Sequence, residues 1–254
     1  MNTDYHIHTR FCNHASGSMK DFIESAINKE LNEISFLDHL TLFEKDFKNS
    51  MTDKEVGLYL YSIKKLALEY KYKISIKSGL EVDYHPDFFK TSEKIISKYD
   101  FDLIGASVHF IEGFNIASRR CQKDYNHIPH NELAKKYFNA LYDMLEYDFF
   151  DMICHFDLIN KFKPDLNFEK DKKIRAKIEK ILNRIKDKKK IVEINTSGFL
   201  HPLSRQYPDK WIIKECIKLE IPLVFSSDSH SPDELGRSFD KIKNILNQDG
   251  DQIF

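Results

Sequence analysis

The sequence predicts an α/β protein in which seven parallel strands and their crossover helices close into one barrel. Two observations support this class. Short apolar runs alternate with helix-length amphipathic segments along the chain, as in parallel sheets, whose neighbouring strands need crossover connections. Nearly every apolar run also ends in a histidine or a carboxylate. A doubly wound sheet would collect such residues at one switch point, whereas their convergence from all strands requires a closed ring.

The predicted strands are short β-type runs, each of which ends in a polar side chain. They cover residues 5–8, 34–39, 74–81, 103–109, 152–155, 191–195 and 223–228. Because strands of such a barrel run in the same direction, their carboxyl ends meet at one rim. We therefore expect the terminal polar side chains to lie close together.

The predicted helices fill the intervals between the strands. They cover residues 18–29, 53–72, 131–146, 168–188, 210–219 and 240–246, with a shorter helix at 91–98. The stretches TDKE at 52–55 and TSE at 91–93 indicate helix starts, because a small oxygen-bearing cap precedes an acid. Residues 112–129 are the one long irregular stretch, which either covers the mouth of the barrel or runs over its surface.

Length and composition are those of an ordinary globular chain, and we expect a single barrel domain over residues 1–254. Hydrophobic residues make up 41% and charged residues 31% of the sequence. The formal net charge of −1 gives no field that would collect nucleic acid or anionic membrane, so neither is expected as a partner. The first residues show no secretory leader, and the four cysteines form no metal or disulfide pattern. A cytoplasmic location with reduced thiols is therefore expected, and the oligomeric state stays open.

The polar strand ends carry a set of metal ligands. In a strand, residues i and i+2 face the same side, so His6 and His8 can both point into the barrel, and Asp228 with His230 would repeat this arrangement. Imidazole and carboxylate together suit Zn, Mn or Fe. The candidate ligands are His6, His8, His14, His39, Glu81, His109, His155, Asp228 and His230.

Two carboxylates have roles that histidine cannot fill. Glu81 closes an apolar run, where an acid is costly without a cation, and its two oxygens can bridge two ions. The alternative for Glu81 is a salt bridge at a strand end. Asp38 either binds metal directly or orients His39 from behind.

Seven motifs together carry a family resemblance over nearly the full chain. They are DYHIHTRFCNHA, FLDHL, GLEVDY, GASVHFIEGF, CHFDLI, EINTSG and SSDSHSPDELG. In this order they resemble the PHP-type histidinol-phosphate phosphatases. The resemblance implies a distorted seven-stranded (β/α)7 barrel with three divalent ions. It places His6, His8, Glu81 and Asp228 on one ion, Glu81, His109 and His155 on a second, and His14, His39 and His230 on a third.

At two positions where members of this family bind phosphate, the chain departs from the family pattern. Members that act on histidinol phosphate usually carry an arginine after DLI and another after NTSG, whereas this chain has NK at 160–161 and FLHP at 199–202. Lysine offers a point charge without the planar fork of arginine. Candidate replacements for substrate binding are Lys161, His201, Arg205 and Arg119.

The resemblance implies hydrolysis of a small-molecule phosphomonoester, L-histidinol phosphate, as in histidine biosynthesis. Three ions and two ligand carboxylates leave a charge of about +4 for a phosphate dianion, and a hydroxide bridging two ions would attack phosphorus. Glu81, Asp228 and His230 are the candidate catalytic residues. The alternatives are a PHP phosphoesterase for a sugar phosphate, a nucleotide or a phosphotyrosyl peptide, an amidohydrolase, and a non-catalytic metal-binding domain.

Overall fold

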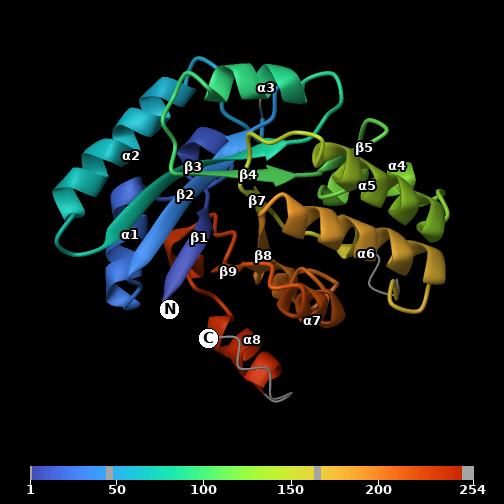
Figure 1. Ribbon diagram of the computed structural model, residues 1–254. Helices are drawn as coiled ribbons and strands as arrows, with labels where there is room; N and C mark the ends of the chain where they lie inside the picture. Colours follow the sequence, from blue (N-terminus) through green and yellow to red (C-terminus); the bar gives the residue numbers. More distant parts are fainter. Residues whose placement is uncertain (1, 44–47, 163–166, 248–254) are drawn as a thin grey trace.

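A computed structural model describes residues 2–43, 48–162 and 167–247, and its central feature is one parallel sheet of seven strands (Figure 1). The strand order follows the chain, as β1-β2-β3-β4-β7-β8-β9. The strands are β1 Thr3–Ile7, β2 Glu33–Leu40, β3 Ser75–Asp83, β4 Leu103–Ser107, β7 Met152–Ile153, β8 Ile191–Asn195 and β9 Leu223–Ser226. All seven predicted strands are thus confirmed.

The sheet curls into a nearly closed barrel. Ile7 at the end of the first strand forms a parallel bridge with Ser229, just beyond the last strand. The amide of His8 donates to the carbonyl of Ser229 over 2.9 Å, and the Ser229 amide donates to the carbonyl of His6 over 3.3 Å. The chain segment after β9 therefore completes the ring that the sequence predicted.

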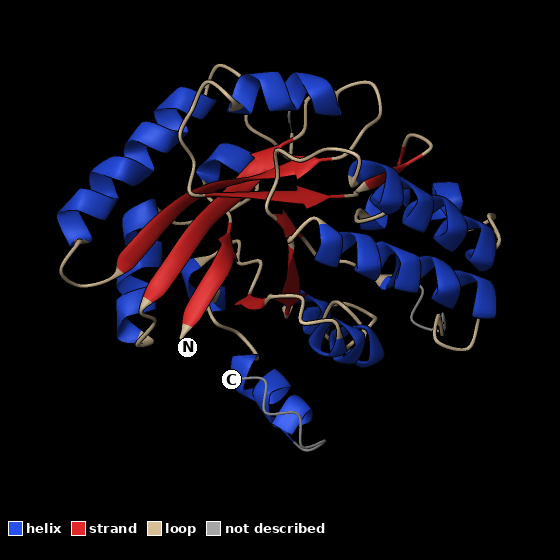
Figure 2. Ribbon diagram, in the orientation of Figure 1, coloured by secondary structure: helices blue, strands red, loops and turns tan. Residues whose placement is uncertain are grey.

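The longer helices lie outside the sheet (Figure 2). They are α1 Met19–Asn28, α2 Val56–Tyr70, α3 Phe89–Ile96, α5 His130–Met144, α6 Lys172–Asp187, α7 Lys210–Lys218 and α8 Phe239–Asn247. Ser18 caps α1 in a reciprocal pair with Asp21, as an oxygen-bearing cap should. The expected start of α3 at Thr91 is wrong, because the helix already begins at Phe89. Every described helix is too short or too polar to span a lipid bilayer.

The stretch 112–129, predicted to be irregular, contains several short elements, which make up about half of it. β5 Phe110–Ile111 pairs antiparallel with β6 Phe114–Asn115, and the turn η3 Arg119–Cys121 leads into α4 Gln122–Tyr125. The side chain of Asn115 accepts hydrogen bonds from the amides of Ala117 and Ser118, at 2.9 and 3.0 Å. Ala117 and Ser118 are thereby fixed at the edge of the barrel mouth.

The barrel interior is apolar at its floor and polar at its rim. Leu37 lies two residues before His39, and Gly79 lies two residues before Glu81, so each pair shares the inward face of its strand. Leu37, Leu103, Met152 and Cys154 form a buried cluster on this floor. A Cβ at Gly79 would lie 2.6 Å from both the Leu37 side chain and the Leu103 carbonyl oxygen. The glycine therefore leaves room for the floor on which the polar rim rests.

Candidate metal centre

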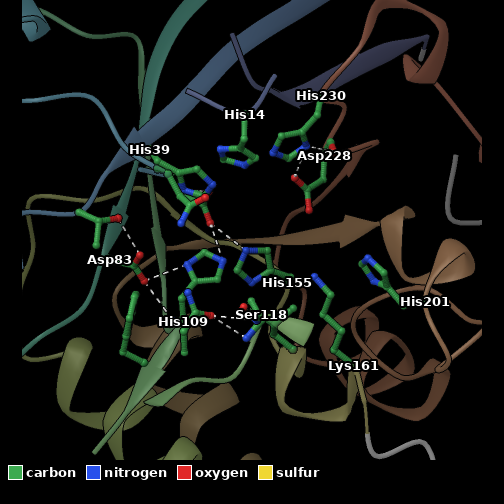
Figure 3. A pocket seen from close by; sticks show the side chains of 17 residues that line it. His14, His39, Asp83, His109, Ser118, His155, Lys161, His201, Asp228 and His230 are labelled. Atoms are coloured by element: carbon green, nitrogen blue, oxygen red, sulfur yellow. Dashed lines mark hydrogen bonds and ion pairs between the residues drawn. The ribbon is translucent and has the colours of Figure 1, made fainter. Parts of the chain in front are cut away.

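All nine predicted ligands gather at the carboxyl end of the barrel. The described strands carry three of them, His6 on β1, His39 on β2 and Glu81 on β3, and the other six follow strand ends or short turns. Seven line one cavity of about 380 Å³, as Figure 3 shows for most of them. They are His14, His39, Glu81, His109, His155, Asp228 and His230. His6 and His8 do not line the cavity and are fully buried.

Glu81 is the centre of this cluster, with only 1% of its surface exposed. Its Oε2 lies 3.2 Å from Nε2 of His6 and 2.9 Å from Nδ1 of His39. Its Oε1 lies 2.8 Å from Nε2 of His155 and 3.7 Å from Nε2 of His109. The two oxygens thus face different groups of imidazoles, and a carboxylate in this position can bridge two cations.

The electrostatics of Glu81 favour its ionised form. Burial alone would raise the pKa of Glu81, but the imidazoles of His39, His6 and His109 hold it well below its usual range. Several imidazole nitrogens around one buried anion form a donor set suited to divalent ions. The residues present therefore fit a bound metal.

A second group of donors surrounds Asp228. Its Oδ1 lies 3.0 Å from Nε2 of His8, and His8, His39 and His230 bring ligand atoms within 4.8 Å of one another. Burial and neighbouring imidazoles lower the pKa of His14 to about 4, and that of His230 well below its usual value. Both rings are therefore neutral at pH 7, which is the state in which imidazole binds metal.

In five of the seven imidazoles, a backbone carbonyl or a carboxylate outside the predicted ligand set lies within hydrogen-bond distance of Nδ1, whereas Nδ1 of His39 faces Glu81. Nδ1 of His6 lies 2.6 Å from Glu193, and Nδ1 of His109 lies 2.9 Å from Asp83. The other three partners are Asp38 for His8 at 3.4 Å, the Cys12 carbonyl for His14 at 2.8 Å, and the Asp228 carbonyl for His230 at 3.1 Å. A donor bond at Nδ1 leaves Nε2 free for a cation.

Asp38 therefore supports the cluster from behind. Its Oδ2 accepts from the Thr9 amide over 2.9 Å, and its Oδ1 accepts from the His39 amide over 3.0 Å. The imidazole it contacts is that of His8, not that of His39 as sequence reasoning suggested.

Glu193 and Asp83 are residues that sequence reasoning missed. Both are buried, and imidazoles lower their pKa values against the effect of burial, those of His6 and His109 respectively. A signal was present for Glu193, which stands inside the predicted strand 191–195, where an acid needs a polar partner, whereas Asp83 lies beyond the predicted end of its strand at residue 81.

Two thiols lie near the cluster, each within a group of side chains that could hold a metal ion. Burial raises the pKa of Cys12 and raises that of Cys154 further, so both stay neutral thiols. Both are buried, as expected for small packing residues.

The sequence predicted that Asp228 and His230 lie on the last strand, but in the structure both lie beyond its end. β9 ends at Ser226, and Asp228 has a φ of 51° in the left-handed region. His155 has a φ of 26°, also unusual for a residue with a Cβ. Such backbone conformations cost about 1–3 kcal/mol each and are common at functional sites.

One wall of the cavity carries two of the predicted substrate-binding residues. Lys161 follows the turn η4 Leu158–Asn160, and His201 follows η5 Ser197–Leu200; both line the cavity (Figure 3). Burial lowers the pKa of Lys161, and burial together with Lys161 lowers the pKa of His201 to about 4. His201 is therefore neutral at pH 7, and Lys161 is the member of this pair that can carry a charge.

The structure does not place the two predicted arginines on this wall. Arg205 is ion-paired with Asp157 over 2.9 Å and donates to the Gln206 carbonyl over 2.8 Å. Arg119 is exposed on η3, where its charge contributes to the lowered pKa of Lys161. Neither arginine lines the cavity.

Fold and site together define a (β/α) barrel whose rim carries a cluster of candidate metal ligands. A model of the PHP domain matches residues 4–197, and the chain belongs to this family. A probable histidinol-phosphatase of Deinococcus radiodurans is 27% identical over 97% of this chain and 94% of the relative. The histidinol-phosphatase of Bacillus subtilis is 28% identical over 93% of this chain and 96% of the relative.

A solved structure shares the same fold. Histidinol phosphate phosphatase from Lactococcus lactis, crystallised with zinc, L-histidinol and phosphate, superposes with a TM-score of 0.83 at 24% identity. The superposition covers 97% of this chain and 93% of that protein.

Proposed function

We propose that this chain is a metal-dependent phosphomonoesterase that hydrolyses L-histidinol phosphate to L-histidinol and phosphate. The observation that carries the proposal is the division of imidazoles between the two oxygens of Glu81. The names of the Deinococcus and Bacillus relatives support the substrate, and the zinc in the Lactococcus structure supports a divalent ion.

The donor groups support three cation positions. His6, His8 and Asp228 would hold one ion together with Glu81, whose carboxylate lies 3.2 and 3.8 Å from the two imidazole nitrogens. His109 and His155 would hold a second ion with Glu81. His14, His39 and His230 would hold the third.

Divalent ions bound in such a set would neutralise a phosphate dianion and would lower the pKa of coordinated water to about 7. The contribution of the chain is to fix the donors before substrate arrives. Asp228 is held by Asn195 at 3.3 Å and Ser197 at 3.1 Å, so its second oxygen has little freedom. We therefore assign Asp228, like Glu81 and His230, to holding the reacting groups in place, and no covalent phosphoenzyme is needed.

Lys161 is the proposed substrate-binding cation. It lines the cavity close enough to Asp228 for the two charges to interact. His201 lies beside it with Nδ1 3.1 Å from the hydroxyl of Tyr207, so His201 can offer a hydrogen bond to substrate but no charge at pH 7.

A second candidate is a PHP phosphoesterase that acts on another phosphomonoester, such as a sugar phosphate, a nucleotide or a phosphotyrosyl peptide. The observation that favours it is that no arginine of the described ranges lines the cavity. A single lysine lacks the bidentate geometry with which arginine recognises phosphate.

A metal-supplemented phosphatase panel tests both candidates. Purified protein is loaded with Zn, Mn or Fe and assayed against histidinol phosphate, a sugar phosphate, a nucleotide and a phosphotyrosyl peptide. We expect kcat/KM for histidinol phosphate to exceed the others by at least about tenfold, or 1.4 kcal/mol. Weak and unselective turnover of histidinol phosphate would favour the second candidate, and no turnover with any metal would contradict both.

A further inference from the structure

The segment 228–230 has to hold two proposed ligands without the support of a strand. Asp228 and His230 both reach the cavity from it, and Asp228 does so in a left-handed conformation. Backbone hydrogen bonds fix the Ser229 part of the segment, through the bridge to Ile7, and the His230 carbonyl, which accepts from the Ser16 amide over 2.8 Å. The remaining peptide groups need other partners.

Arg237 supplies several of these partners. Its Nη2 donates to the carbonyls of Ser227 and Asp228, each over 2.9 Å, and its Nε donates to Ser227 over 3.2 Å. The side chain is only 14% exposed, so these bonds are largely shielded from water. A guanidinium has the fork geometry that two adjacent carbonyls require, and an ammonium does not.

Glu234 fixes the other end of the same segment. Its Oε2 accepts from the His230 amide over 2.7 Å, while its Oε1 pairs with Nη1 of Arg237 over 3.0 Å. The two side chains thus form one ion pair that holds the peptide groups on both sides of Ser229. We call this arrangement the Glu234–Arg237 clamp.

The clamp also bears on the orientation of the His230 ring. The carbonyl of Asp228 accepts from Arg237 and, over 3.1 Å, from Nδ1 of His230. A carbonyl held in this direction keeps the proton on Nδ1 and leaves Nε2 for a cation. Arg237 therefore acts on the ligand through one intervening carbonyl.

The clamp is itself anchored to other parts of the barrel. Asp4 of β1 accepts from the Ser227 amide over 2.9 Å and from the Gly236 amide over 3.0 Å. Thr196 donates to the carbonyl of Arg237 over 2.8 Å. These hydrogen bonds fix the clamp, and through it the segment 228–230, relative to Asp4 and Thr196.

We propose that Glu234 and Arg237 are positioning residues that set the metal affinity of the segment 228–230. The inference rests on the proposed metal-dependent function. Substitution of a residue that orients a metal ligand through a hydrogen bond typically lowers metal affinity by about 10–100-fold. Because the clamp touches no substrate, its loss should weaken metal binding while leaving KM for the phosphomonoester unchanged once metal is saturating.

The test compares R237M, R237K and E234Q with wild type. Metal per chain is measured by elemental analysis after removal of free metal, and activity is titrated against metal concentration. For R237M we expect a lower metal content and an activating metal concentration raised about 10–100-fold, with kcat recovering at saturating metal. R237K and E234Q should show smaller shifts in the same direction. R175M is the matched control, because Arg175 forms an i,i+4 pair with Glu179 on α6.

The outcomes separate this inference from the proposed function. Metal content and activation by metal equal to wild type in R237M would overturn the role of the clamp. If circular dichroism shows that R237M does not fold, the same measurements are made on R237K and E234Q. Metal content and activation by metal equal to wild type in both variants would then overturn the role of the clamp. A wild-type protein that binds no divalent metal would contradict the proposed function, and the inference about the clamp with it.

Discussion

The substitution Glu193→Gln tests how the buried carboxylates support the metal centre. Glu193 lies on β8 with no exposed surface. Its Oε1 contacts Nδ1 of His6 and the hydroxyl of Ser226, and its Oε2 contacts the His155 amide and the side-chain amide of Asn195. All four partners can donate a hydrogen bond, so the carboxylate is matched to its surroundings as a pure acceptor.

A carboxamide cannot satisfy these four donors. In either orientation its NH2 group faces two of them, so about two hydrogen bonds to a charged group are lost. At about 1.5–3 kcal/mol each, the free energy of unfolding should fall by about 3–6 kcal/mol. Where the NH2 group faces His6, that ring can accept its hydrogen bond only by moving its proton to Nε2, which removes the proposed metal donor.

The assay is urea unfolding of metal-free protein followed by circular dichroism, with metal content measured in parallel. Glu179→Gln is the control, because its pair with Arg175 is exposed and such pairs contribute only about 0.3–0.5 kcal/mol. An E193Q protein whose unfolding free energy lies within about 1 kcal/mol of wild type, with unchanged metal content, would refute the reasoning.

Four further predictions concern the cavity. Glu81→Gln should abolish phosphatase turnover while circular dichroism stays that of wild type; turnover near the wild-type rate would contradict the proposed bridging role. Lys161→Ala should raise KM by about 10–100-fold, since a hydrogen bond to a charged group is worth about 1.5–3 kcal/mol, and Lys161→Arg should restore binding. The pKa of His201 is lowered to about 4 in the folded chain, so the unfolded chain takes up a proton at this residue at a higher pH than the folded chain does, and acid destabilises the fold. Replacement by Gln removes this effect, so the urea midpoint of H201Q should fall less between pH 7 and pH 4 than that of wild type. A chelator should abolish activity and added Zn or Mn should restore it, and activity that survives complete metal removal would exclude the mechanism.

The sequence was sufficient for the barrel and for the gathering of its ligands. Alternating strand and helix periodicity specifies parallel strands, and direction alone brings their carboxyl ends to one rim. Glu81, His39 and His6 could be placed there because each stands in an apolar strand. Their gathering follows from topology and needs no knowledge of side-chain conformation.

The parts that sequence reasoning missed depend on contacts between distant segments. Arg205 seemed free to meet phosphate, but Asp157, distant in the sequence, holds its guanidinium. The hairpin of β5 and β6 is too short to leave a periodic signal, and its two-residue strands are defined only by pairing. Asp228 lies beyond the end of its strand because the backbone turns into a left-handed conformation that residue type alone does not announce.

The buried acids change the expected charge balance of the site. Sequence reasoning assigned about +4 to three ions and two ligand carboxylates. Three further carboxylates lie behind the ligands, Glu193, Asp83 and Asp38, and their formal charges reduce that sum to about +1. The two charges of a phosphate dianion would then exceed it. The one lysine or arginine on the described cavity wall, Lys161, is therefore more important to the proposed function, because it would supply positive charge that the ions and carboxylates leave lacking.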